Sequence, residues 1–439
     1  MCRVISVLNV VLMTVTANCY FACKANPWLI PVFLAVFLIA NLLPFFSKKG
    51  IPGFRLKVCN HGYHCLRQFL CSVILSVLCH IALLFYCIPD RVIDLLLSML
   101  VCFLVEAVFF WNGMICLYCT SAQLGVRERV IGAACGMIPI VNLIALNRIL
   151  KIVSAEVEFE TQKAVLNASR KSQKVCETKY PILLVHGIFF RDYKFPNYWG
   201  RIPGELIKNG ATLFYGEHQS ARSVADSAAE LTARIKDIVE NTGCQKVNVI
   251  AHSKGGLDCR YALHYLDAAP YVASLTTINT PHRGCKFADY LLEKAPESLR
   301  RNVENTYNKA FRKLGDKNPD FMAAVTDITS RNSIDRDKEM CTPECVYSSS
   351  VGSKMSHAVG GKFPLNLTYR FVHQFDGGND GLVGEESFAW GEEYTFLKND
   401  GKRGISHGDM IDLNRENIPG FDVREFYVQL VHRLQEKGL

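Results

Sequence analysis

The sequence lacks the patterns that mark nucleic-acid-binding proteins and repeat proteins. Its net charge of +8 is modest for 439 residues, and no basic stripe with interleaved aromatic residues is present. Such a stripe is the usual footprint of a nucleic-acid surface. No internal repeat and no low-complexity tract occurs either. A nucleic-acid partner and a solenoid architecture are therefore excluded.

Cysteine is abundant, yet its placement indicates neither a disulfide framework nor a metal site. Of 18 cysteines, twelve lie among residues 1–135, mostly in or near apolar runs, where a thiol is a small hydrophobe. The remaining six show no CxxC or Cys/His ligand spacing: Cys176, Cys244, Cys259, Cys285, Cys341 and Cys345. A Cys341–Cys345 bridge stays open as an alternative.

Charge is nearly absent from long stretches of the first 150 residues. Trp28–Phe46 carries no charge and approaches the 20 or so residues that a helix needs to cross a bilayer. Phe69–Ile88 and Val92–Trp111 are similar, whereas Val4–Cys23 is more polar and Val130–Leu146 is short. We therefore expect an all-α transmembrane domain over residues 1–153, with four or five spans.

Two features of this region allow alternatives. A signal peptide is the rival interpretation of the first run, but Arg3 is its only charge and another apolar run follows at once. Glu106 is an ionisable residue inside the third run, and such residues are often functional. No partner pattern accompanies Glu106, so we favour a role in helix packing or at the interface.

The orientation follows from lysine and arginine, which concentrate in cytoplasmic loops. Residues 47–68 hold five such residues, so we expect this loop inside the cell, in a multi-pass protein of a bacterial plasma membrane. The later part of the chain would lie outside if residues 130–146 span, and inside if they do not. We lean towards the extracytoplasmic side.

After a charged linker at 154–178, strand and helix patterns alternate, which is typical of a parallel sheet. The expected strands are 181–185, 211–215, 246–250, 274–279, 346–350 and 369–375. Helices are expected at 198–208, 222–241, 286–326 and 422–435. In the third of these, one face carries Val303, Tyr307, Phe311 and Leu314, which suits core packing or a lid.

Ser253 occupies the turn between an apolar strand and a helix. The run Ala251-His-Ser-Lys-Gly-Gly256 places small residues around it, as a sharp nucleophile elbow requires. Ala251 stands where glycine is commonest. The alternative is a serine that only caps the helix.

A second turn lies about seventy residues upstream. The apolar run 181–185 ends at His186-Gly187-Ile188, the kind of loop that supplies one oxyanion amide beside an elbow. The backbone N–H groups of Ile188 and Lys254 would be the two donors, and fixed donors of this kind contribute a few kcal/mol each. We expect His186 itself to be structural.

Two late loops hold residues that a serine nucleophile needs, a base and an acid that orients the base. Asp380 lies in a glycine-rich turn, and His407 lies between Ser406 and Gly408 before the last helix. The alternatives are His373, placed in the expected strand, Asp376, which suits a turn, and His432 in the last helix.

Several of these motifs together resemble the true bacterial triacylglycerol lipases of the Pseudomonas type. The similar segments are 179–187, 198–203, 209–211, 247–261, 281–284 and 379–384. The resemblance implies an α/β-hydrolase fold with a helical, lid-like insertion over residues 179–439. It also implies Ser253, Asp380 and His407 as the catalytic triad.

The resemblance raises one cofactor question. That family often binds calcium, and Asp409 matches one ligand position, but residues 355–366 offer no carboxylate for the other. Asp409 is thus a weak calcium candidate, and triad chemistry itself needs no metal or organic cofactor.

We therefore expect a membrane-anchored serine hydrolase, a lipase or esterase that cleaves lipid esters through an acyl-enzyme. Its partners would be a lipid or ester substrate and the membrane, and its oligomeric state stays open. An acyltransferase with the same acyl-enzyme is one alternative. An inactive membrane sensor or scaffold is another, against which the intact Ser253, His407 and Asp380 argue.

Overall fold

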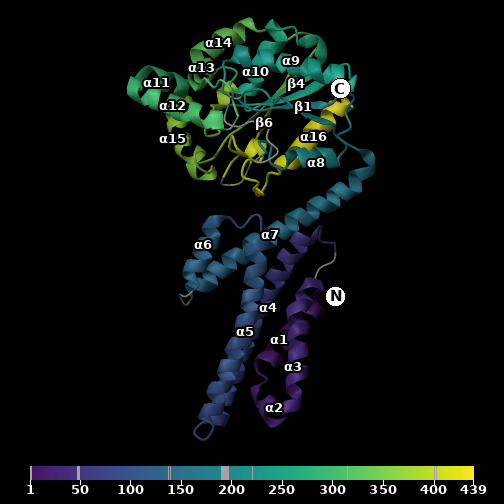
Figure 1. Ribbon diagram of the computed structural model, residues 1–439, viewed down its shortest axis with the longest axis vertical. Coiled ribbons are helices and arrows are strands. Elements are labelled where there is room, and N and C mark those ends of the chain that lie inside the picture. Colours follow the sequence, from purple (N-terminus) through teal and green to yellow (C-terminus); the bar gives the residue numbers. More distant parts are fainter. Residues whose placement is uncertain are drawn as a thin grey trace. The chain divides into compact units, whose positions relative to one another are not determined.

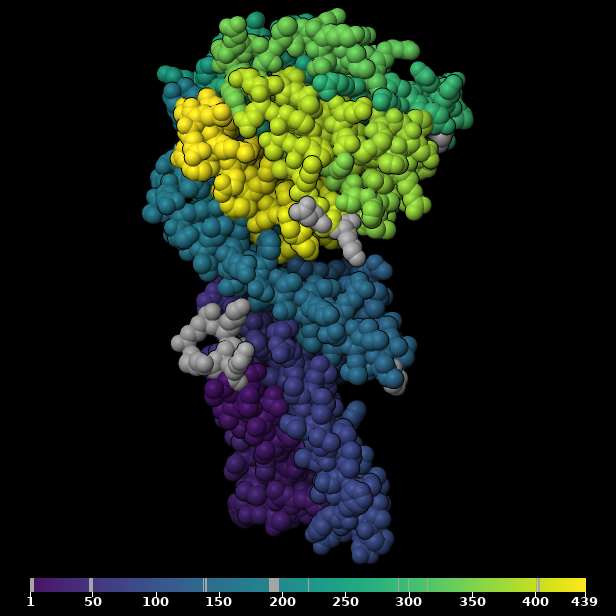
Figure 2. Space-filling model, turned by 180° about the vertical axis from the view of Figure 1, so that it is seen from behind, coloured from purple at the N-terminus to yellow at the C-terminus, as the bar shows by residue number. Residues whose placement is uncertain are grey.

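The computed structural model describes residues 2–46, 50–136, 138, 140–188, 197–219, 221–313, 315–399, 401 and 403–439. The chain divides into two compact units, unit 1 from Met1 to Ala168 and unit 2 from Ser169 to Leu439 (Figure 1). In the space-filling view, the C-terminal part of unit 2 spreads in yellow and yellow-green over one face of that unit (Figure 2).

Unit 1 is helical. Its elements are α1 (Cys2–Ala17), α2 (Tyr20–Ala25), η1 (Pro27–Leu29), α3 (Ile30–Leu42), η2 (Leu43–Phe46), α4 (Phe54–Cys87), α5 (Val92–Thr120), α6 (Val126–Cys135) and α7 (Val141–Arg170), whose last residues belong to unit 2. Within the described residues, three helical stretches are long and apolar enough to cross a membrane: Pro27–Phe46, Phe54–Cys87 and Val92–Thr120. Val4–Ala17 is a shorter apolar helix.

Residues 130–146, which the sequence left open as a fifth span, do not form a single helix. Helix α6 ends at Cys135 and α7 begins at Val141, and the sequence between them holds Gly136 and Pro139, residues that disfavour a continuous helix. The extracytoplasmic placement assumed this span, so the side of unit 2 stays undecided. Of the expected inner loop 47–68, residues 47–49 lie outside the described residues and α4 already begins at Phe54.

The expected linker at 154–178 is helical as far as Arg170, because the apolar spacing of α7 continues into it. Buried side chains recur at helical intervals along α7: Leu146, Ile149, Leu150, Val153 and Val157. One charge that suggested a linker is itself buried, since Glu156 accepts hydrogen bonds from Arg55 (2.8 Å) and Ser121 Oγ (2.6 Å).

Helices α4 and α5 approach closely where glycines face each other. A Cβ on Gly62 would lie 2.8 Å from the carbonyl oxygen of Gly113, and a Cβ on Gly113 would lie 2.5 Å from Leu66 Cγ. Small residues at a crossing let two apolar helices pack backbone to backbone.

Unit 2 is built on a six-stranded parallel sheet in the order β2-β1-β3-β4-β5-β6. Its strands are β1 (Ile182–Val185), β2 (Leu213–Tyr215), β3 (Val247–His252), β4 (Val272–Ile278), β5 (Tyr347–Ser353) and β6 (Glu393–Leu397). Every neighbouring pair is parallel; β1 and β3, for example, pair Leu184 with Ile250. This is the α/β-hydrolase class of fold that the sequence predicts.

Helices cover both faces of the sheet. Ile182 and Leu184 point to the face covered by α8 (Ile202–Lys208) and α16 (Val423–Glu436). Leu183 and Val185 point to the face covered by α9 (Val224–Thr242) and α10 (Lys254–Tyr265). Because successive side chains of a strand alternate, a fully apolar β1 serves two cores.

Residues 369–375 form a helix rather than the expected strand. They belong to α15 (Leu365–Asp376), and the sixth strand is β6 instead. The run Tyr-Arg-Phe-Val has high strand propensity, but Leu365 and Val372 are buried at a helical spacing of seven. Between β4 and β5 the chain forms α11 (Lys286–Lys294), α12 (Glu297–Lys313), α13 (Phe321–Asp327) and α14 (Ser330–Glu339).

Two isoleucines of α8 test the core of unit 2. Ile202 is completely buried in the α8/α16 layer, whereas Ile207 is 58% exposed. Ile202→Ala should lower the free energy of unfolding by about 2–5 kcal/mol, because it leaves a cavity in a packed layer. Ile207→Ala should change it by less than about 0.5 kcal/mol. Denaturant unfolding of unit 2, followed by tryptophan fluorescence, measures both, and equal losses would contradict this packing.

Candidate active site

Ser253 lies at the tip of the turn from β3 to α10, with φ 58° and ψ −134°. A non-glycine residue rarely adopts positive φ, and such strain is common at functional turns. A Cβ on Gly255 would lie 2.4 Å from the His186 carbonyl oxygen, and one on Gly256 would lie 2.2 Å from Thr280 Oγ1. The two glycines of the motif are therefore required by close packing.

The surrounding strands hold the strained serine backbone. The N–H of Ser253 donates to the Ile278 carbonyl (2.9 Å), and its carbonyl accepts from Thr280 Oγ1 (2.8 Å). Although Ser253 occupies the N-cap position of α10, its side chain makes no capping hydrogen bond with the described part of the chain. The capping alternative therefore does not explain this serine.

Asp380 and His407 come together beside this turn. Asp380 Oδ2 lies 2.6 Å from His407 Nδ1 and accepts a hydrogen bond from Asn279 Nδ2 at 2.6 Å. Asp380 Oδ1 accepts from the backbone N–H groups of Leu382 (2.9 Å) and Val383 (2.8 Å). The carboxylate is fully buried and each of its oxygens has two partners, so it is fixed in one orientation.

Asn279 is a member of this arrangement that the sequence interpretation missed. It follows β4 directly, has φ 47°, and also donates to Ser353 Oγ at 2.8 Å. A polar residue at the carboxyl end of a buried parallel strand was the available signal, because ligands and catalytic groups gather at that edge of the sheet.

His407 packs against His252, the residue before Ser253, with ring centroids 4.4 Å apart. Its backbone N–H donates to the Asp380 carbonyl at 2.8 Å, a second link between the two loops. Burial holds the pKa of His252 well below its usual value. The His252 ring is therefore neutral and has no positive charge that would oppose a proton on His407.

The alternative residues lie elsewhere. Asp376 ends α15 and accepts from the N–H groups of Lys286 and Phe287, both at 3.4 Å, at the start of α11. Burial raises its pKa. His373 is exposed on α15, not in a strand, and bonds the Gly377 carbonyl (2.9 Å). His432 of α16 lies 3.1 Å from the Val175 carbonyl.

The loop after β1 brings Ile188 to the same cavity as Ser253 and Lys254. The Tyr198 hydroxyl orients this loop, because it accepts from the Gly187 N–H (3.0 Å) and lies 2.7 Å from His252 Nδ1. The sequence interpretation placed Tyr198 at the start of an expected helix and in a family segment, and did not foresee this role.

His186 is fully buried and bonds the backbone of neighbouring loops, as a structural histidine does. Its Nδ1 lies 2.8 Å from the Gly187 carbonyl, and its Nε2 lies 3.2 Å from that of His218. The two imidazole rings stack with centroids 4.0 Å apart.

Lys254 has a buried side chain beneath the turn. Its ammonium donates to Asp258 Oδ1 (2.7 Å) and Ser227 Oγ (3.0 Å), which fixes the first turn of α10. Burial raises the pKa of Asp258 to about 7 despite the neighbouring ammonium. The spacing of four residues between Lys254 and Asp258 is a helical ion-pair signal that the sequence interpretation did not use.

An apolar cavity of about 350 Å³ lies over Ser253. The insertion supplies most of its lining, including Phe287, Ala288, Leu292, Val303, Tyr307, Phe321, Met322 and Val325. Phe311 is 2% exposed and packs in the same cluster as Ile188 and Phe321. The apolar stripe of α12 therefore serves both as core and as cavity wall, while Leu314 lies outside the described residues.

Asp409 does not fit a calcium ligand in this fold. Arg403 Nη2 lies 2.7 Å from its Oδ1, and its Oδ2 accepts the Ser406 N–H at 2.8 Å. A guanidinium thus takes the position that a cation would need. Among the described residues, no group of three His, Cys, Asp or Glu side chains could hold a metal ion.

Comparisons with known proteins agree on one family, although no family model matches the chain. It is 36% identical over 166 residues to the triacylglycerol lipases of Pseudarthrobacter phenanthrenivorans and Burkholderia plantarii. Each match covers 35% of this chain, with 51% of the first protein and 46% of the second. The chain thus spans about half the length of these bacterial relatives.

Among solved structures, lipase BlEst2 of Bacillus licheniformis in its mature form is 24% identical, with a TM-score of 0.43 over 58% of this chain and 92% of that one. The metagenomic carboxyl esterase MGS0156 is 15% identical, with a TM-score of 0.47 over 59% and 76%. Triacylglycerol lipase 2 of Saccharomyces cerevisiae is 36% identical over 275 residues, which are 55% of this chain and 74% of the yeast protein. The chain therefore belongs to the triacylglycerol lipase family, as its motifs predict.

Proposed function

We propose that this chain hydrolyses carboxylic ester bonds of lipids through an acyl-enzyme on Ser253. The observation that carries the proposal is the Asp380–His407 pair, joined at 2.6 Å, beside a strained Ser253 that lines an apolar cavity. Membership of the triacylglycerol lipase family supports the same reaction class.

The proposed reaction follows from the proton positions. Asp380 accepts the Nδ1–H of His407, so Nε2 of the neutral ring is free to act as the base. Ser253 Oγ attacks the ester carbonyl carbon as its proton passes to Nε2, and His407 then returns that proton to the leaving alcohol. Water repeats the sequence on the acyl-enzyme and releases the carboxylic acid.

The oxyanion would be held by backbone N–H groups of Ile188 and Lys254. Both residues line the cavity with Ser253. Their positions are fixed by the Tyr198 hydroxyl and by the buried Lys254–Asp258 pair. Donors held in place in this way stabilise developing charge without reorganisation.

The cavity suggests the substrate class. Most of the residues in its walls are aliphatic or aromatic, with Arg300 and the paired Lys254 as the charged exceptions, and such walls suit an acyl chain better than a charged head group. The apolar helices of unit 1 would place this site at a lipid surface, because tethering raises the local concentration of membrane-borne substrate.

Replacement of the nucleophile is the first test. Ser253→Ala should abolish labelling by a fluorophosphonate probe and lower ester hydrolysis by several orders of magnitude, because only binding and oxyanion contacts remain. Ser356→Ala, at an exposed serine of the same unit, should leave both unchanged. Full labelling of the Ser253→Ala protein would place the nucleophile elsewhere.

The two neighbouring aspartates give a second test. Asp380→Asn should lower kcat about 10⁴-fold, because His407 would lose the acceptor that holds its tautomer. Asp376→Asn alters the contacts of Asp376 with the start of α11, not the His407 pair, and should cost far less. Steady-state kinetics on a soluble ester compare them, and the reverse ranking would make Asp376 the orienting acid.

Removal of unit 1 gives a third test. A chain that begins at Ser169 should hydrolyse short dispersed esters at about the full-chain rate, because all the proposed catalytic groups lie in unit 2. It should be slower than the full chain on esters within bilayers, since it lacks the apolar helices. A folded truncated protein that neither binds the fluorophosphonate nor cleaves soluble ester would show that unit 1 helps to build the site.

A further inference from the structure

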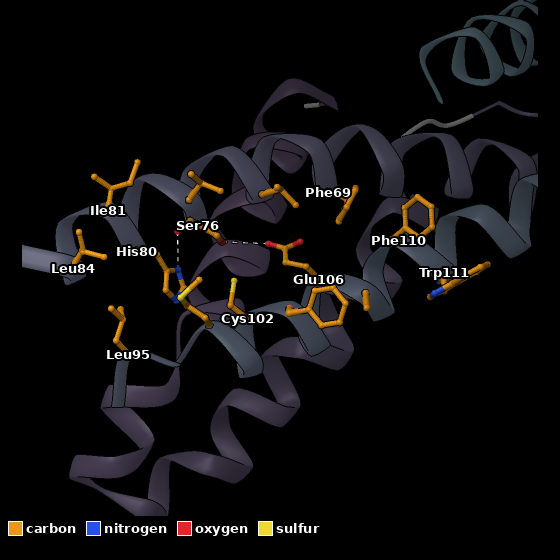
Figure 3. A pocket seen from close by; sticks show the side chains of 15 residues that line it. Phe69, Ser76, His80, Ile81, Leu84, Leu95, Cys102, Glu106, Phe110 and Trp111 are labelled. Carbon is orange, nitrogen blue, oxygen red and sulfur yellow. Dashed lines mark hydrogen bonds between the residues drawn. The ribbon is translucent and has the colours of Figure 1, made fainter. Parts of the chain in front are cut away.

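Unit 1 contains a second apolar cavity, between α4 and α5, that the proposed reaction does not use (Figure 3). Its volume is about 640 Å³. Apolar side chains such as Phe69, Leu84, Leu95 and Trp111 line it, with Glu106 and His80 among them. Both helices are long and apolar enough to cross a membrane. Membrane lipid would then surround them.

Glu106 lines this cavity and carries a polar atom without a hydrogen-bond partner among the described residues. Its side chain is 6% exposed, and its Oε1 accepts from Ser72 Oγ (2.6 Å) and Ser76 Oγ (3.3 Å). Its Oε2 is buried and has no hydrogen-bond partner among the residues that the structure describes. A buried polar atom left unpaired costs free energy that a bound molecule can recover.

His80 does not supply that missing partner. Its Nδ1 lies 2.9 Å from the Ser76 carbonyl (Figure 3). Its Nε2 lies 3.2 Å from Ser98 Oγ, so both ring nitrogens are occupied. The lining contains no lysine or arginine. A carboxylate without a cationic partner is costly in such surroundings, so burial favours the protonated form, in which Oε2–H is a hydrogen-bond donor.

The length of the cavity and the depth of Glu106 indicate which kind of ligand would accept a hydrogen bond from Glu106. Sixteen residues separate Leu95 from Trp111, which corresponds to about 24 Å along an α-helix and suits an extended acyl chain. Glu106 is the middle residue of α5, fourteen residues or about 21 Å from either end, so a hydrocarbon layer of about 30 Å crossed by this helix would contain it. A charged head group does not reach that depth, whereas the ester carbonyl of a neutral lipid does.

We propose that this cavity binds a neutral acylglycerol, with one acyl chain between α4 and α5 and an ester carbonyl that accepts from Glu106. The site lies in a different unit from Ser253, and binding there requires no hydrolysis. It makes unit 1 a lipid-binding unit in addition to an anchor, and it gives Glu106 a role beyond the helix packing that the sequence favoured.

Photocrosslinking of the full chain tests the proposal. The Ser253→Ala protein in phosphatidylcholine nanodiscs is exposed to a triacylglycerol that carries a diazirine in its acyl chains, and the labelled peptides are mapped. Labels within residues 69–111 report this cavity, and labels within 253–383 report the cavity over residue 253. Excess unlabelled triolein should suppress the first set more effectively than the same excess of oleic acid.

Two pairs of variants distinguish the contribution of the Glu106 carboxyl to lipid binding from that of the cavity volume. Glu106→Leu should lower labelling of residues 69–111 about tenfold, whereas Glu106→Gln keeps an N–H donor and should retain most of it. Ala107→Phe fills the lining and should abolish this labelling, whereas Ala82→Phe, at an exposed alanine of α4 outside the lining, should not.

The same variants provide controls for folding and tests of the alternative occupants. With Ser253 restored, each variant should elute as one species and react with the fluorophosphonate, and labelling within 253–383 should be unchanged. Labelling that is equal in the Glu106→Leu and unsubstituted proteins would overturn the proposal. So would stronger competition by oleic acid, or cross-links between two chains through α4 and α5, which would identify a fatty-acid site or an interface between copies.

Discussion

The hydrogen bonds to Asp380 are the constraint on which the order of unit 2 depends. One carboxylate accepts from Asn279 after β4, from the two N–H groups of its own turn, and from His407 in the last loop. Elements that lie more than a hundred residues apart in the chain thereby meet at one edge of the sheet. Because the group is completely buried, the loss of any donor would leave one of its oxygens with a single hydrogen-bond partner and no water to replace the other.

A second layer of buried contacts sets the backbone of the elbow. Tyr198 joins the loop after β1 to His252, and Lys254 joins the first turn of α10 to Asp258 and Ser227. The glycines at 255 and 256 let the turn approach His186 and Thr280 more closely than any side chain would permit. The strain at Ser253 persists because these neighbours over-determine its position.

The buried carboxyl groups of Asp380 in unit 2 and Glu106 in unit 1 have different hydrogen-bond environments, which suggests different roles. Both oxygens of Asp380 are saturated by protein donors, so this group can only orient its neighbours. Glu106 lines an apolar cavity and has one oxygen with serine donors and one buried oxygen with no partner among the described residues. A saturated group supports a rigid site, whereas an unsatisfied one favours a ligand that completes it.

Local patterns were enough wherever neighbouring residues decide the structure. The apolar runs predict α3, α4 and α5, although the charged start of α4 hid fifteen residues of that helix. The strand and small residues around Ser253 predict the elbow for the same reason, because the turn is set by its own side chains. The strand expected at 369–375 was wrong, since strand propensity there is overridden by packing on one face of α15.

What the sequence by itself determined is the division into an apolar helical part and an α/β part with Ser253 at a sharp turn. Tertiary structure decided which acid lies against His407, because Asp376 and Asp380 have similar local sequences and differ only in the distant groups that they meet. Tertiary structure likewise decided that the Tyr198 hydroxyl bonds His252 and that Arg403 donates to Asp409. It also decided that Glu106 lines a cavity. Periodicity describes the face of a single element, whereas these contacts depend on how separate elements pack together.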